Sequence, residues 1–210
     1  CIKTKEDALA AIESAQAAFP AWSNTTALER SQILEKIAQR ILERKEELAN
    51  IITAEMGKPL VNAMYEVDST SAYFKWFAEE ARRIYGEHIP SNAPNKRLLT
   101  IKQPIGVIAA ITPWNFPLQM LSRKLAPALA AGCTCLIRPS NQSPISAIEL
   151  VKIFEECGMP KGVTNLVIGA AEEITDVWLE SSVVKKISFT GSTEVGVELK
   201  KKAANTVKKV

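Results

Sequence analysis

The stretch that decides the fold is Ile105-Gly-Val-Ile-Ala-Ala-Ile-Thr-Pro-Trp-Asn-Phe-Pro117. Its apolar run from Val107 to Ile111 is continuous rather than alternating, which is typical of a strand buried on both faces of a parallel sheet. The run stops at Thr112-Pro113, and Pro117 stands where a following helix would begin. The stretch therefore predicts a stiff turn, flanked by prolines, at the carboxyl end of a parallel strand.

Asn115 is the polar side chain that this turn presents. Open α/β sheets bind their ligands at the carboxyl ends of the strands, so we expect the residue to face a ligand site. A carboxamide whose backbone is fixed by prolines can donate its N–H to an oxyanion with little reorganisation. Asn115 is therefore our candidate catalytic residue.

Strand and helix patterns alternate from Ile105 to the end of the chain. The expected strands are 107–111, 134–137, 165–168 and 186–189, and the expected helices are 117–131, 144–157, 172–180 and 193–204. We expect Ser143 to cap the second of these helices. Such alternation predicts the α/β class with a doubly wound, Rossmann-like parallel sheet, so residues 105–210 are expected to form dinucleotide-binding βα units.

Residues 1–86 are expected to be the helical N-terminal part of the same cofactor-binding domain. The expected helices are one capped by Thr4 that ends before Pro20, one capped by Thr26 that ends at Gly57, and one from Leu60 to Tyr85. We expect the aromatic residues of the last helix to pack in the core; they are Tyr73, Phe74, Trp76 and Phe77.

Residues 87–104 form a separate segment between the helical part and the sheet. Its turn-forming residues, which separate two short extended pieces, are Pro90, Asn92, Pro94 and Asn95. A hairpin outside the main sheet has unpaired edges, which promote association. We therefore expect a protruding β-hairpin of the kind used for oligomerisation.

Three motifs carry a resemblance to a known family. Thr112-Pro-Trp-Asn-Phe-Pro117, Leu125-Ala-Pro-Ala-Leu-Ala-Ala-Gly-Cys133 and Ile187-Ser-Phe-Thr-Gly-Ser-Thr193 resemble the aldehyde dehydrogenase superfamily in order and spacing. The finer resemblance is to the succinate-semialdehyde dehydrogenases and depends chiefly on the pair Arg123-Lys124. It implies NAD(P)-dependent oxidation of an aldehyde, succinic semialdehyde to succinate, in the complete enzyme. The alternative is a non-catalytic dinucleotide-binding or interaction module.

The resemblance also implies residues that are not found here. Family members continue past a segment like Lys208-Lys-Val210 into a Glu-Leu-Gly-Gly motif with the general base, and the cysteine nucleophile follows later. Neither motif is present in these 210 residues. We therefore expect the cofactor-binding part of a chain more than twice as long, which by itself does not oxidise aldehydes.

The usual phosphate-binding motif of dinucleotide folds, G-x-G-x-x-G, is absent, so another segment must bind the phosphates. We expect this segment to be Thr190-Gly191-Ser192. The segment follows an apolar strand and opens a helix, so its backbone N–H groups and the helix dipole favour a pyrophosphate. The resemblance assigns Gly191 and Ser192 to this role and adds Thr112, Pro113 and Trp114 to the cofactor contacts. Ser192 could alternatively serve only as a helix cap.

The adenosine ribose is expected after the second strand, at Arg138, Ser140 and Asn141. A glutamate at position 141 would repel a 2′-phosphate, whereas Asn141 carries no charge. Arg138 offers a guanidinium suited to phosphate. The cofactor is therefore expected to be NADP or NAD, with NADP accepted; the alternative makes Arg138 a solvent-facing cation and Asn141 a turn residue.

Arg123 lies two turns into the helix that follows Asn115, near the mouth of the proposed site. An arginine there can pair bidentately with a substrate carboxylate, and the resemblance implies this role. The alternative is a helix-surface arginine that binds no ligand.

The charge and residue composition of the chain argue against several classes of binding partner. A net charge of +3 does not suggest a nucleic acid or a membrane, and we interpret Lys200-Lys-Lys202 as a solvated helix face. No metal site is expected, because the only histidine, His88, has no ligand partners at useful spacing. The cysteines, including Cys133 and Cys135, are expected to be buried hydrophobes.

We expect a small-molecule aldehyde as the substrate and a homodimer or homotetramer as the assembly of the complete enzyme. The expected location is cytoplasmic, or mitochondrial if a targeting segment was removed.

Overall fold

The computed structural model describes residues 5–210, so the predicted cap at Thr4 lies outside the described residues. The helical part consists of α1 (Lys5–Ser23), α2 (Ala27–Glu43), α3 (Lys45–Met56), α4 (Leu60–Glu80) and the 3-10 turn η1 (Ala81–Arg83). The hairpin consists of β1 (Glu87–Ile89) and β2 (Leu98–Thr100). The alternating part consists of β3 (Val107–Ile111), α5 (Gln119–Ala130), β4 (Thr134–Arg138), α6 (Ile145–Glu156), β5 (Thr164–Leu166), α7 (Ala171–Glu180), β6 (Val184–Phe189) and α8 (Thr193–Ala204).

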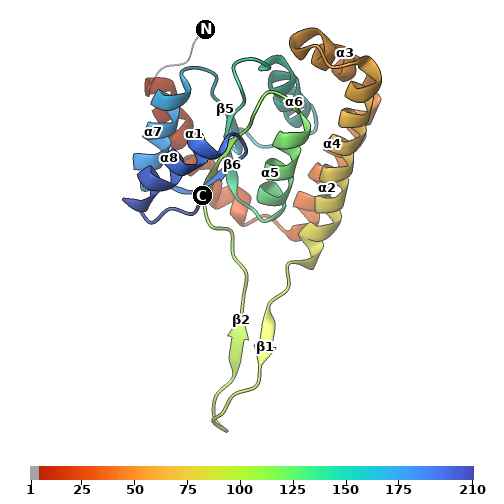
Figure 1. Cartoon of the computed structure of the whole chain (residues 1–210). Coiled ribbons are helices and arrows are strands. Elements are labelled where there is room, and N and C mark those ends of the chain that lie inside the picture. The colour runs from red at the N-terminus through yellow and green to blue at the C-terminus, as the bar shows by residue number, and fades with distance from the viewer. Residues whose placement is uncertain (1–4) are drawn as a thin grey trace.

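The main sheet is parallel, with strand order β5-β4-β3-β6, and helices cover both of its faces (Figure 1). Successive residues of a strand point to opposite faces, and β3 divides its side chains accordingly. Ile108 and Ala110 join a core with α2 to α6, whereas Val107, Ala109 and Ile111 join a second core with α1, α7 and α8. The predicted doubly wound α/β fold is confirmed.

The predicted end of the first helix is wrong, because α1 continues through Pro20 to Ser23. A proline inside a helix removes one backbone hydrogen bond, and its ring clashes with a backbone carbonyl of the preceding turn. Here it lies in the last turn, and the continuation carries Trp22 into the core, where its side chain is fully buried. Burial of this large side chain offsets the local cost of the proline.

The second predicted helix is in fact two helices, α2 and α3, because Arg44 leaves the helical conformation and interrupts it. The predicted cap at Thr26 and the predicted stop at Gly57, which has a φ of +76°, are confirmed. At the break, the Arg44 guanidinium contacts Glu47 and Glu149, both at 2.6 Å. This bend directs α3 toward α6, with which it packs.

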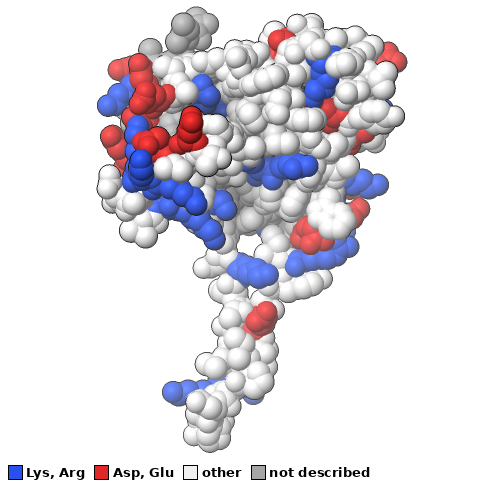
Figure 2. All heavy atoms as spheres, in the orientation of Figure 1, with Lys and Arg blue, Asp and Glu red and all other residues white. Residues whose placement is uncertain are grey.

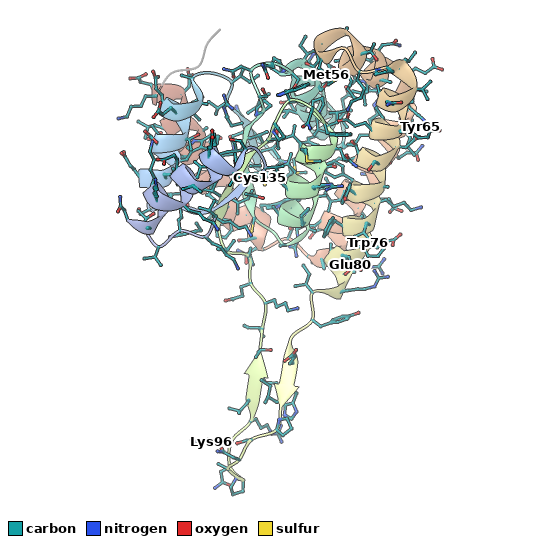
Figure 3. All side chains as sticks on the ribbon, viewed as in Figure 1. Met56, Tyr65, Trp76, Glu80, Lys96 and Cys135 are labelled. Atoms are coloured by element: carbon teal, nitrogen blue, oxygen red, sulfur yellow. The ribbon has the colours of Figure 1, made fainter. Side chains whose placement is uncertain are left out.

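The aromatic run of α4 does not all face the core. Phe74 is buried and meets the Phe154 ring edge-on at 5.6 Å between centroids. Trp76 is 62% exposed, and Figure 3 shows it and Tyr65 on the outer side of the helix. Residues two positions apart on a helix lie on different faces, so a run of this length cannot be buried as a whole.

The hairpin projects from the body, as predicted, with Lys96 near its tip (Figures 1 and 3). Its strands pair antiparallel, from Glu87 with Thr100 to Ile89 with Leu98. All six strand residues are exposed. Within residues 5–210, neither outer edge of the hairpin pairs with another strand.

Candidate functional site

The candidate site lies where the loops after β3, β4 and β6 meet at one edge of the sheet. Ile111, at the end of β3, pairs with Arg138 on one side and with Phe189 on the other. Two backbone hydrogen bonds extend this pairing into the loops: the Thr112 N–H donates to Arg138 O at 3.2 Å, and the Thr190 N–H donates to Ile111 O at 3.1 Å. The three segments predicted to bind the cofactor and the oxyanion are therefore adjacent.

The turn that carries Asn115 is exposed at its tip and anchored at its base. Asn115 and Trp114 are exposed, and Pro113 is half-buried. Thr112 is buried, and its hydroxyl has no hydrogen-bond partner among residues 5–210. The Nζ of Lys58 donates to the backbone carbonyl of Asn115 at 2.8 Å, which fixes the peptide group next to the predicted oxyanion donor.

The predicted helix cap at Ser143 is wrong. Its hydroxyl instead donates to the carbonyl of Trp114 at 3.2 Å, so it binds the turn. The first N–H groups of α6 are bound by a carboxylate from α3: Glu55 accepts from Ile145 at 2.8 Å and from Ser146 at 3.2 Å. A cap can be predicted from the sequence only when the capping side chain is within a few residues of the helix start. Glu55 is about ninety residues away from the start of α6, so the local sequence carries no sign of this cap.

Arg138, the last residue of β4, and Asn141, in the loop that follows, bind the same backbone carbonyl. The Gly169 carbonyl accepts from a terminal guanidinium nitrogen of Arg138 at 3.3 Å and from the Asn141 amide at 2.9 Å. Arg138 is only 9% exposed, and burial lowers its pKa, so the reading as a solvent-facing cation is wrong. Its buried Nε has no partner within the described part of the chain. Ser140, in the same loop, accepts from the Gln142 N–H at 3.2 Å.

Gly191 and Ser192 open α8 at the carboxyl end of β6. The Ser192 hydroxyl accepts from the Val195 N–H at 3.4 Å, so the residue does cap the helix. A Cβ atom on Gly191 would lie 2.4 Å from the Phe189 ring, a distance that real contacts do not reach. A larger residue here would have to displace the Phe189 ring, whereas glycine does not, and Gly191 and Ser192 are both exposed at the start of the helix.

A groove of about 600 Å³ runs between α7 and α8, beside this helix start. The residues that line it include the apolar Ala171, Val195, Val197 and Leu199. Figure 2 shows acidic side chains gathered around it, and those that line the groove are Glu172, Asp176, Glu194 and Glu198. The sequence analysis did not predict this groove. The available signal was the pair Val195 and Val197, which stand two positions apart in the predicted helix and so cannot both face the core; both are exposed.

Arg123 and Lys124 point to different neighbours. The Arg123 side chain is exposed, and its guanidinium carbon lies 5.1 Å from the centroid of the Tyr73 ring, a cation–π arrangement. Lys124 donates from Nζ to the Thr190 hydroxyl at 2.6 Å. Burial, with Arg123 and Lys186 nearby, lowers the pKa of Lys124 to about 8.

The remaining predictions concern cysteines, metals and charge. Cys133 and Cys135 are buried as free thiols, as predicted, and burial raises the pKa of both. Within residues 5–210, no group of His, Cys, Asp and Glu could hold a metal, and no helix is long and apolar enough to cross a membrane. His88 is exposed on β1, and Lys201 pairs at the surface with Glu198.

Comparison with known proteins agrees with this architecture. The glutarate-semialdehyde dehydrogenase of Pseudomonas putida is 50% identical over 200 residues, which cover 95% of this chain and 42% of that protein. The mitochondrial succinate-semialdehyde dehydrogenase of Oryza sativa is 49% identical over 210 residues, covering 100% of this chain and 40% of that protein. The chain thus spans about two fifths of the length of these relatives.

Solved structures share the fold. The crystal structure of an NADP-dependent enzyme from Escherichia coli superposes with a TM-score of 0.98 at 45% identity, covering 99% of this chain and 43% of that one. The family model described as "Aldehyde dehydrogenase family" matches residues 2–210. With a family model over nearly the whole chain and relatives this similar, the chain belongs to the aldehyde dehydrogenase family.

Proposed function

We propose that this chain is the cofactor-binding part of an NAD(P)-dependent dehydrogenase that oxidises a carboxylate-bearing aldehyde, succinic semialdehyde to succinate. The observation that carries the proposal is the meeting of the Asn115 turn, the Arg138–Asn141 loop and the start of α8 at one edge of a parallel sheet. Open α/β sheets bind dinucleotides at such edges. Similarity to succinate- and glutarate-semialdehyde dehydrogenases supports the substrate class.

The residues fit a dinucleotide. Gly191 and Ser192 would hold the pyrophosphate with backbone N–H groups at the start of α8, where both residues are exposed. The groove between α7 and α8 has an apolar lining suited to an adenine ring. When bound, the nicotinamide would accept the hydride from the substrate. Thr112, Pro113 and Trp114 would contact the cofactor from the end of β3.

NADP is accepted in this proposal because residue 141 carries no charge. Asn141 holds the loop through Gly169, and Ser140 lies beside it. Arg138 is largely enclosed, so its contribution would come from the unpartnered Nε N–H and from the positive charge behind the ribose site. NAD would bind with the same contacts except those to the 2′-phosphate.

The chain's own catalytic contribution would be Asn115, whose side-chain N–H stabilises the oxyanion formed when a thiolate attacks the aldehyde. The thiolate would come from a cysteine of the complete enzyme, because burial keeps Cys133 and Cys135 as thiols. Arg123 would pair with the substrate carboxylate, its guanidinium oriented by Tyr73. Alone, the chain would bind cofactor and not turn over aldehyde.

Three measurements test the proposal. Millimolar NADP or NAD should raise the unfolding temperature of this chain, because a ligand that binds only the folded state stabilises it. A chimera, in which this chain replaces the matching segment of the Pseudomonas putida relative, should oxidise succinic semialdehyde. Arg123→Ala in the chimera should raise the KM for succinic semialdehyde by at least about tenfold more than the KM for an uncharged aldehyde.

The outcomes separate the two function classes. Cofactor stabilisation with an inactive chimera would favour the non-catalytic dinucleotide-binding module. Equal effects of Arg123→Ala on both aldehydes would refute the carboxylate assignment while leaving the oxidation in place.

A further inference from the structure

A buried ion pair lies under the Asn115 turn. Glu66, on α4, has a fully buried side chain, and Lys58, in the loop between α3 and α4, is almost as deeply buried. The Lys58 ammonium pairs directly with one oxygen of the Glu66 carboxylate. Burying two charges is costly unless hydrogen bonds satisfy both groups, so such a pair needs further partners.

Glu66 finds its further partners at the start of α5. Its second carboxylate oxygen accepts from the backbone N–H of Leu118 at 3.0 Å and of Gln119 at 3.2 Å. The first residues of α5 receive no such bond from their own N-cap, because Leu118 at that position offers no side-chain acceptor. A carboxylate at a helix N-terminus also interacts favourably with the helix dipole. The downstream end of the turn is therefore fixed by Glu66.

Lys58 fixes the upstream end of the turn. Its Nζ donates to the Asn115 carbonyl at 2.8 Å and lies 3.8 Å from the centroid of the Phe116 ring. The ammonium thus bridges the peptide group of the predicted oxyanion donor and the carboxylate that binds α5. One ion pair contacts residues on both sides of Pro117.

We propose that Lys58 and Glu66 are positioning residues for Asn115, and that oxyanion stabilisation depends on this pair. The inference rests on the function proposed above. A catalytic donor must be held within about half an ångström of its working position, and supporting residues provide that precision. The pair does so by fixing the carbonyl of Asn115 and the helix start that follows it, so the carboxamide is presented from a rigid backbone.

Hydrogen–deuterium exchange on this chain tests the positioning directly. Lys58→Met combined with Glu66→Gln removes both charges together and keeps the side-chain volumes, which avoids leaving an unpaired buried charge. We expect amide exchange across residues 114–120 to increase by at least about tenfold relative to the unchanged chain. Unchanged exchange in this segment would overturn the proposal.

Glu55→Gln is the matched control, because Glu55 caps α6 with the same chemistry at Ile145 and Ser146. It should raise exchange at the start of α6 and leave residues 114–120 as they are. Lys58→Arg, which keeps the charge, should retain most of the protection of the turn. If the double variant fails to fold, Glu66→Gln alone serves as the second variant, because it removes the fully buried charge and leaves Lys58 bound to the Asn115 carbonyl. Exchange at residues 118 and 119 should still rise, and unchanged exchange there would overturn the proposal.

A kinetic cycle in the chimera tests the dependence on Asn115. The double variant should lower kcat by at least about tenfold with little change in the KM for the aldehyde, as for loss of transition-state stabilisation. In an Asn115→Ala background the same change should cost little more, because the residues act as one unit. Full additivity would overturn the proposal. An inactive chimera would refute the proposed function alone, because exchange still reports on the pair.

Discussion

The charge at position 141 should decide which cofactor binds. Asn141→Glu would place a carboxylate where a 2′-phosphate is expected, and it would accept a hydrogen bond from a ribose 2′-hydroxyl. We expect the variant to bind NADP at least about tenfold more weakly while NAD binding is kept or improved. Isothermal titration with both cofactors measures this, and Asn141→Gln, which adds length without charge, is the control. Unchanged binding of both cofactors would place the ribose elsewhere.

Lys124 should make stability depend on pH. Its pKa in the folded chain is lowered to about 8, chiefly by burial, from an ordinary value of 10.5. Between these pH values the unfolded chain binds more protons than the folded chain, so the free energy of unfolding should rise with pH across that window. Lys124→Met removes this contribution, so the variant should be relatively most stable near neutral pH and lose that advantage as pH rises.

Urea unfolding at several pH values across the window measures the effect. Lys202→Met is the control, because Asp176 raises the pKa of Lys202 and moves its titration above the window. A pH slope that is identical in Lys124→Met and the unchanged chain would contradict the assignment.

At the scale of the element, the junction of β6 and α8 depends on Gly191. Gly191→Ala would force its Cβ atom against the Phe189 ring at 2.4 Å, which requires the ring or the helix start to move. We expect a loss of about 1–3 kcal/mol in the free energy of unfolding, measured with urea. Gly196→Ala is the control, because its Cβ atom would lie 3.4 Å from the same ring. Phe189→Ala should rescue Gly191→Ala if the ring is the cause.

Elements with a local signal were predictable from the sequence. The strand β3 and the cap at Thr26 were predicted correctly. Burial on both faces of a strand and helix capping each depend on residues that are close together in the sequence. The course of α1 beyond Pro20 was not predictable, because it depends on where Trp22 packs. The Lys58–Glu66 pair was missed for the same reason: its partners lie about fifty residues away in the sequence.

At the scale of the whole molecule, the sheet separates two cores, one on each of its faces. The core that includes α2 to α6 lies behind the Asn115 turn, whereas the core of α1, α7 and α8 adjoins the groove proposed for adenosine. β3 contributes side chains to both cores, so one strand supports the proposed oxyanion site and the proposed cofactor site. The hairpin joins neither core and contributes no side chain to them.

The hairpin should therefore serve association rather than folding. Leu99 is 70% exposed on β2, and Ile101 just beyond it is 75% exposed, on an element whose outer edges are unpaired within residues 5–210. Exposed edges and apolar side chains of this kind favour strand pairing between copies. We expect light scattering to show a mass that rises with concentration, and Leu99→Lys with Ile101→Lys to reduce that rise without lowering the unfolding temperature. Tyr65→Lys, at a site 69% exposed on α4, is the matched control and should leave association unchanged. A monomeric chain at high concentration would show that the hairpin alone does not drive assembly.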